Sequence, residues 1–193
     1  MRVLLRKPLT GLCLLLLSNI SLAQFSIQHA ETRLVDEVYV LDANLHYKFT
    51  EVIIEALQNG VSLTLRLTIM VERERGYWWN ERIATLKQGY ELKYYALSRQ
   101  YELKELNSDK QETNSDKQET FGQLNDVLSR LNKLKDFPLI DKHLIENDET
   151  YKVHLQTHLD IESLPVPLRP IAYLSSQWRL SSEWYLCPLQ PLK

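Results

Sequence analysis

The dominant pattern along the chain is the alternation of apolar and polar residues. In VSLTLRLTIMV, residues 61–71, every second side chain is apolar and most of those between are polar. A period of two is typical of a strand that buries one face, so this segment predicts a half-buried antiparallel strand. The same pattern predicts further strands at 39–47, 84–94, 97–106, 151–161 and near 177–186.

Two segments have helical periodicity instead. Thr50 is placed to cap a short helix over residues 50–60, and Asn59-Gly60 is placed to end it in a left-handed conformation. From Phe121 to Leu134 apolar residues recur every three or four positions, and Thr120 with Gln123 fits a capping box. The segment predicts a second helix, which Pro138 would keep from continuing.

The crossover SLPVPLRP, residues 163–170, contains three prolines, and we expect it to be polyproline-like. Together, these patterns predict six or seven strands and two short amphipathic helices. This predicts an α+β fold, mainly antiparallel β-sheet, in which a sandwich-like arrangement and a curled sheet both remain open.

Residues 107–120 consist of the heptad NSDKQET written twice without a change. Neither copy contains an apolar residue, so the repeat cannot form a coiled-coil seam. We expect a duplicated flexible loop, and we expect that deleting one copy leaves stability nearly unchanged because closure entropy grows slowly with loop length.

The first residues have the pattern of a secretory signal peptide. Three basic residues precede the apolar run 9–17, and the small-residue pattern Ser21-Leu22-Ala23 follows it. The run is about half of the ~20 residues that a membrane-spanning helix needs, so an uncleaved anchor is the weaker interpretation. We therefore expect cleavage after Ala23, a single exported domain over 24–193 and no transmembrane helix in the mature protein.

Cleavage changes the charge and the cysteine content of the chain. The net charge falls from −2 to −5, because three basic residues and no acidic ones are removed. Nucleic acid and anionic membrane surfaces are therefore unfavourable partners. Cys187 becomes the single cysteine; it is either buried or paired between chains, and we favour burial, the commoner state of a free cysteine.

Candidate catalytic and metal-binding chemistry is sparse. His154 and His158 share a strand pattern, which separates their Cα atoms by about 13 Å, whereas nitrogen ligands of one zinc ion lie within about 4 Å of each other. The sequence has no nucleophile elbow, glycine-rich phosphate loop or Cys/His cluster. We expect no metal or cofactor, and we consider an enzyme less favoured than a binding module, although a carboxylate site assembled from distant residues leaves no local signature.

The candidate binding residues lie in GYWWNER, residues 76–82, and near the C-terminus. Register from Leu86 and Tyr90 directs Trp78 inward and Trp79 outward, where Trp79 is either a stacking platform or is covered by its own domain. Nearby arginines either bind a carboxylate ligand or pair with the interleaved glutamates. In SSQWRLSSEWY, the tryptophans Trp178 and Trp184 are expected inward and a polar face outward. The set is Arg75, Trp78, Trp79, Arg179 and Glu183.

Four segments carry a family resemblance: AETRLVDEVYVLDANLHY, EALQNGVSLTLRLTIMVERERGYWW, YYALSRQYEL and LDIESLPVPLRPIAYLSSQWRLSSEWY. Together they resemble an exported family of Gram-negative bacteria, the domain of unknown function 4390, from about residue 25 to residue 189. The resemblance implies a signal peptide and a single periplasmic domain, and it supplies no catalytic or ligand residues. It also implies proximity to two-component systems, since family members are often encoded beside a sensor kinase. The doubled heptad departs from the family, whose members look shorter there.

The leading hypothesis is a non-enzymatic binding or accessory module in the periplasm for a protein or envelope component. One alternative is an extracytoplasmic partner of a membrane two-component sensor kinase. Another is an envelope hydrolase with a carboxylate-based site.

Overall fold

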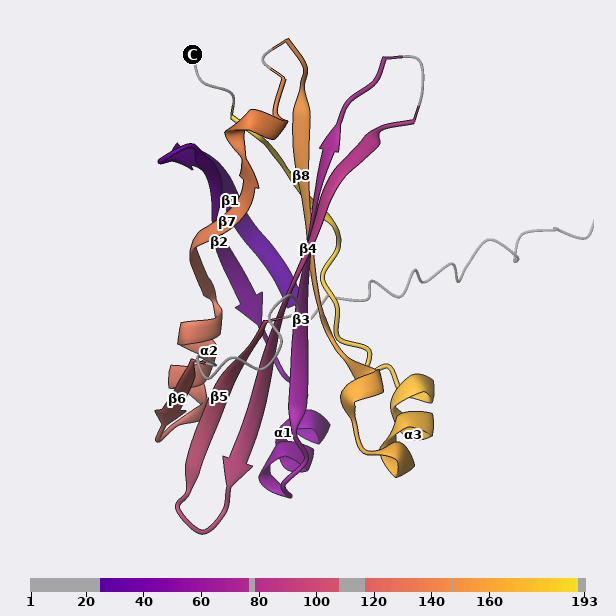
Figure 1. Ribbon diagram of the computed structural model, residues 1–193. Helices are drawn as coiled ribbons and strands as arrows, with labels where there is room; N and C mark the ends of the chain where they lie inside the picture. Colours follow the sequence, from indigo (N-terminus) through magenta and orange to yellow (C-terminus); the bar gives the residue numbers. More distant parts are fainter. Residues whose placement is uncertain (1–24, 77–78, 108–116, 147, 191–193) are drawn as a thin grey trace, which may run out of the picture.

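The computed structural model describes residues 25–76, 79–107, 117–146 and 148–190, which form two antiparallel sheets (Figure 1). The smaller sheet has the order β1-β2-β7 and the larger has the order β6-β5-β4-β3-β8-β9. The strands are β1 (Phe25–Val35), β2 (Val38–Tyr47), β3 (Leu63–Arg73), β4 (Glu81–Tyr95), β5 (Gln100–Asn107), β6 (Gln118–Phe121), β7 (Lys133–Asp141), β8 (Tyr151–Leu159) and β9 (Tyr185–Pro188).

Short helices connect the strands. They are α1 (Glu51–Gln58), α2 (Leu124–Leu131), α3 (Arg169–Leu174) and the 3-10 turns η1 (Lys142–Leu144), η2 (Ile161–Ser163) and η3 (Val166–Leu168). The expected α+β class and the dominance of antiparallel sheet are thereby confirmed. The caps of α1 are also as predicted, because the Thr50 hydroxyl accepts a hydrogen bond from the Ile53 N–H and Gly60 has a φ of +87°.

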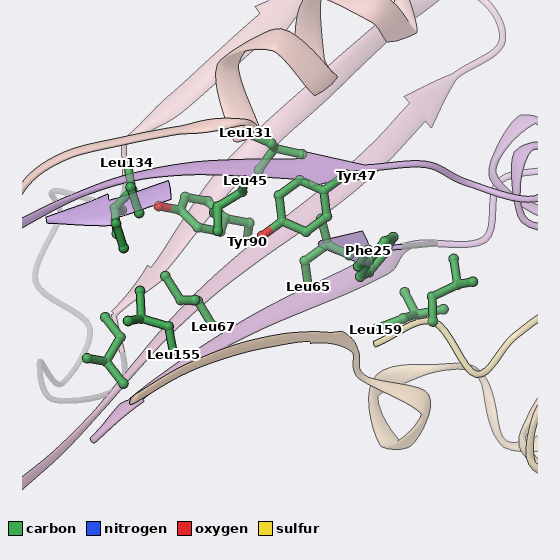
Figure 2. Packing of buried hydrophobic residues seen from close by; sticks show 14 of the residues in the cluster. Phe25, Leu45, Tyr47, Leu65, Leu67, Tyr90, Leu131, Leu134, Leu155 and Leu159 are labelled. Atoms are coloured by element: carbon green, nitrogen blue, oxygen red, sulfur yellow. The ribbon is translucent and has the colours of Figure 1, made fainter. Parts of the chain in front are cut away.

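The strongest alternating segments form the centre of the fold. In β3 the side chains predicted to face inward are fully buried from Leu63 to Val71, and in β2 the predicted inward face from Tyr39 to Tyr47 is buried as well. These strands belong to different sheets, yet their buried side chains form one cluster with residues from β1, β4, β7, β8 and α2 (Figure 2). The Tyr47 hydroxyl also lies 2.9 Å from the Thr157 hydroxyl inside this core and so links β2 to β8.

The second predicted helix is shorter than expected. It spans only 124–131, its N-cap Gln123 makes no side-chain capping bond with a described residue, and Thr120 lies in β6 opposite Glu102. The end of the segment is β7, an edge strand that pairs with β2. Its Pro138 lies at a register irregularity, where a missing N–H donor is tolerated. The predicted capping box was wrong, because Thr120 belongs to β6 and pairs there with Glu102.

The sequence pattern did not predict β1 at all. A bulge between Ile27 and His29 shifts the register of this strand against β2, so the inward parity changes partway along it. A search for uninterrupted alternation misses such a strand.

The crossover after β8 is not polyproline-like. It contains η2, η3 and α3, and its prolines are accommodated because a proline in the first turn of a helix removes no intrahelical hydrogen bond. The last strand is shorter than predicted, and Trp184 is 42% exposed rather than inward. Even-numbered residues are buried at 178, 180 and 182, whereas from β9 onward the odd-numbered Cys187, in β9, and Leu189, just after it, are buried instead.

The two ends of β3 define two poles of the molecule, about 35 Å apart for an eleven-residue strand. The hairpin pole consists of the described residues 74–76 and 79–80, between β3 and β4, with the adjoining residues 142–146 and 148–150. The helix pole consists of α1, η3, α3 and the turn 96–99 between β4 and β5. In Figure 1 the β3–β4 hairpin extends upward, whereas α1, α3 and the β4–β5 turn lie at the lower end.

Candidate functional site

Among the described residues of the hairpin pole, Trp79 is the most exposed aromatic side chain. It is 96% exposed, in agreement with the outward direction predicted for it. The neighbouring Trp78 lies outside the described residues, so its predicted inward direction stays a prediction. Tryptophan is buried in most proteins, and a fully presented indole suits recognition of another surface.

An ion-pair network lies beneath this tip. The Arg73 Nε atom is 3.1 Å from Glu81 Oε2, and its Nη1 atom is 2.7 Å from Glu146 Oε1. Arg75 also pairs with Glu81. The hydrogen bond from Arg73, assisted by the charge of Arg75, lowers the pKa of Glu81. Glu81 therefore stays ionised at neutral pH, and Arg75 is held by a carboxylate of its own hairpin.

Backbone contacts fasten the base of the hairpin to the end of β8. The Glu74 N–H donates to the Thr150 carbonyl at 2.8 Å, and the Glu146 N–H donates to the Tyr151 hydroxyl at 3.1 Å. Lys152 also pairs with Glu74. The network joins both strands of the β3–β4 hairpin to the segment that leads into β8, so it holds the base of the hairpin that carries Trp79.

The two histidines of β8 point to different environments. His154 lies opposite Met70, with its Nε2 atom 3.4 Å from Glu72 Oε2, whereas His158 lies opposite Arg66. Burial lowers the pKa of His158 below the usual 6.5. Among the described residues no group of three or more His, Cys, Asp and Glu side chains could hold a metal ion.

The predicted C-terminal site residues lie away from the hairpin pole. Arg179 and Glu183 are both exposed. They flank a segment bonded to the far end of β8, where the Leu159 N–H donates to the Leu180 carbonyl at 2.9 Å and the Ser182 N–H to the Thr157 carbonyl at 2.8 Å. Because Arg75 adjoins the other end of β8, roughly 25 Å away by strand length, the structure does not gather the predicted residues into one site.

A known protein family matches the chain over all the strands described above. The family described as "Domain of unknown function (DUF4390)" matches residues 23–188, from before β1 to the end of β9. The chain belongs to the DUF4390 family. No curated protein and no solved structure matches it significantly. The family resemblance inferred from the sequence is thus confirmed.

Two open hollows lie elsewhere on this DUF4390 protein. One of about 370 Å³ is beside the start of α1, and one of about 300 Å³ is on the outer face of β1, β2 and β7. The first is lined by Lys48, Phe49, Thr50, Glu51, Val52 and Gln177, and the second by residues that include His29, Glu31, Asp42 and Lys133. Both are shallow and contain charges of both signs, which fits solvated surface better than a site for one small molecule.

Sequence reasoning missed a set of exposed apolar side chains at the helix pole. Leu97 is fully exposed, Leu174 is 86% exposed, Val166 is 70% exposed and Ile171 is 59% exposed. The spacing of Ile171 and Leu174, three residues apart, is a helical signal, but the surrounding prolines favoured an extended interpretation.

Among the described residues no helix is both long and apolar enough to cross a bilayer.

Proposed function

We propose that this DUF4390 protein is an exported, non-enzymatic binding or accessory module that holds a protein or another envelope component at its hairpin pole. The observation that carries the proposal is the 96% exposure of Trp79 on a hairpin whose base is fixed by Arg73, Glu81 and Glu146. Tryptophan is enriched among the side chains that dominate binding energy, and a hairpin whose base is already ordered loses less entropy on binding.

Export to the periplasm is part of the proposal. The basic residues, apolar run and small-residue pattern of 1–23 support it. A sandwich-like arrangement of the two sheets is proposed as well. It is supported by the common core of β2 and β3 and by the contact between Tyr47 and Thr157.

The proposal predicts that Trp79→Ala abolishes recovery of the partner when the exported protein is purified from cell envelopes. Because Trp79 is exposed, the free energy of unfolding should change by no more than about 0.5 kcal/mol. Leu186→Ala, on the outer face of β9, is the matched control and should leave recovery unchanged. If the alanine variant at position 79 retained the partner, the hairpin pole would not be the contact surface.

The identity of the recovered protein separates the two binding hypotheses. A membrane sensor kinase would establish the alternative raised by the family resemblance. A soluble periplasmic protein or a non-protein envelope component would favour a general accessory role.

A further inference from the structure

The first half of β4 has a partner strand on only one side. β4 pairs with β3 from Glu81 to Leu92, whereas its pairing with β5 begins only at Gln88. Among the described residues, no strand pairs with the other edge of residues 81–87. In Figure 1 the β3–β4 hairpin accordingly extends well beyond the upper end of β5. This stretch, which we call the open edge, begins two residues after Trp79.

The main chain of the open edge points away from β3 at every second residue. In β3 the even-numbered residues direct their main-chain groups toward β8, because the Asp160 N–H donates to the Thr64 carbonyl. The odd-numbered residues of β3 therefore face β4, where each is opposite an even-numbered residue from Ala84 onward. The odd-numbered Thr85 and Lys87 accordingly direct their N–H and C=O groups to the open edge.

The inward side chains of the open edge are incompletely covered. Tyr90 and Leu92, which β5 flanks, are 6% and 0% exposed. Leu86 and Ala84 belong to the same inward face but are only half-buried, even though their partners in β3 are fully buried. An additional strand along the open edge would therefore remove apolar surface from water.

The outward side chains of the open edge are basic or uncharged. Lys87 is exposed and forms no ion pair with any described residue. The side chain of Arg82 is 59% exposed, and its Nε atom is 3.7 Å from Glu72 Oε1. Thr85, which lies between the two basic residues, is exposed and neutral. This face favours a neighbouring strand that carries carboxylates, since opposite charges across a strand pair attract.

A second copy of the chain fits this edge poorly. Antiparallel pairing of two open edges would bring Lys87 and Arg82 of both copies onto one face of the strand pair, where like charges repel. Lysine on an exposed edge strand is a common feature that prevents such pairing between like strands. The same charge favours an acidic strand from a different protein.

We propose that the open edge of β4 binds an extended segment of a partner protein as an additional strand, with acidic side chains beside Thr85 and Lys87. Apolar side chains would alternate with the acidic ones and cover Leu86 and Ala84. The inference rests on the proposed function, because it specifies the chemistry of the partner that Trp79 contacts. The indole would pack against the end of the added strand.

A synthetic peptide can test this preference without the natural partner. The probe has about eight residues, enough to span the open edge, and alternates glutamate with valine. A peptide of equal length that alternates lysine with valine is the control. The account predicts that the glutamate peptide shifts the amide resonances of Thr85 and Lys87 in the isotope-labelled exported protein, and that the lysine peptide does not. No saturable shift at these amides, or equal shifts with both peptides, would overturn the proposal.

Substitutions at the open edge separate main-chain pairing from side-chain contact. Thr85→Pro removes one outward N–H and no bond to β3, so it should raise the Kd of the glutamate peptide by at least about tenfold. Thr85→Val keeps that N–H and should change the Kd by less than about twofold, and urea unfolding of both variants checks that they fold. An equal Kd for the two variants would contradict strand addition.

A charge reversal gives a check that loss of folding cannot imitate. Lys87→Glu should transfer the preference of the protein from the glutamate peptide to the lysine peptide. A preference that stayed with the glutamate peptide would contradict the assigned role of Lys87. Binding that appeared only after deletion of residues 107–113 would make the chain's own repeat the occupant of the edge, which would also overturn the proposal.

Recovery of the partner from cell envelopes distinguishes this inference from the proposed function. If Trp79→Ala abolishes recovery while Thr85→Pro and Lys87→Glu leave it unchanged, the hairpin pole remains the contact surface and strand addition is wrong. If Thr85→Pro and Lys87→Glu abolish recovery while Trp79→Ala leaves it unchanged, strand addition is supported and the role proposed for Trp79 is wrong.

Discussion

Deletion of one copy of the doubled heptad tests how the fold uses this repeat. The two copies are identical, so deleting either one produces the same chain, and that chain retains the residues that form β6. Among the described residues, the last backbone hydrogen bond between the strands on either side runs from the Glu105 N–H to the Lys117 carbonyl at 3.0 Å. Residues 108–116, most of the expected loop, lie outside the described residues, whereas Asn107 belongs to β5 and Gln118–Thr120 to β6.

The expected change in the free energy of unfolding follows from the length of the connection between β5 and β6. The bond between Glu105 and Lys117 encloses eleven residues, 106–116, and deletion of seven leaves four, an ordinary length for a hairpin connection. Shortening a flexible loop from eleven residues to four lowers the entropic free-energy cost of closing it by about 0.9 kcal/mol. The deletion should therefore leave stability unchanged or raise it by up to about 0.9 kcal/mol, a shift of roughly 2–4 °C in Tm.

Urea unfolding followed by circular dichroism measures this difference. Leu103→Ala is the control for sensitivity, because Leu103 is buried in β5 between Leu92 and Glu119 and its truncation should cost about 2–5 kcal/mol. A loss of more than about 2 kcal/mol on heptad deletion, comparable to that of a core truncation, would show that the deleted residues stabilise the fold. The reasoning from loop entropy would then be refuted.

Three further substitutions and treatments test the core and its titrating groups. Tyr47→Phe should cost about 1–3 kcal/mol in urea unfolding, because it leaves the buried Thr157 hydroxyl without its partner; no change would mean that this contact contributes nothing. Burial lowers the pKa of His158 below 6.5, so the unfolded chain binds the proton first and stability should decline as pH falls below about 6.5; His158→Gln should flatten this slope, and an unchanged slope would contradict the reasoning. Burial raises the pKa of Cys187 to about 11, so a thiol reagent at neutral pH should react only after urea unfolding, and rapid reaction of the folded protein would contradict its burial.

The central strands could be predicted because their alternation is unbroken. Every second residue of β3 from Leu63 to Val71 is apolar and buried, and β2 behaves in the same way from Tyr39 to Tyr47. Such a pattern leaves one register that buries the apolar face, so local sequence is sufficient to define the strand.

The remaining elements depend on tertiary contacts that local pattern does not encode. The bulge after Ile27 hides β1, and the edge position of β7 makes Pro138 acceptable within a strand. Thr120 has the spacing of a helix cap, but pairing with Glu102 places it in β6. These elements were missed because pairing partners far along the chain override their local preference.

The candidate site likewise has features that local sequence could predict and features that depend on tertiary contacts. The outward direction of Trp79 was inferred by continuing the register back from Leu86 and Tyr90, and its exposure agrees, although Trp79 lies before β4 and a register shift at Val71/Glu72 separates it from those residues. The role of Arg75 could not be decided from sequence, since its pairing with Glu81 depends on how the hairpin closes. The exposure of Leu174 was missed because the prolines around α3 favoured an extended chain over a helical turn.

Photo-crosslinking in living cells is the most direct test of the central claim that the hairpin pole is the contact surface. A photoreactive phenylalanine analogue would replace Trp79, and in a second strain Leu186, which is half-exposed on the outer face of β9. The account predicts one discrete crosslinked partner from position 79 and none from position 186. If position 79 captured nothing, or if both positions captured the same species equally, the hairpin pole would not be the site of binding.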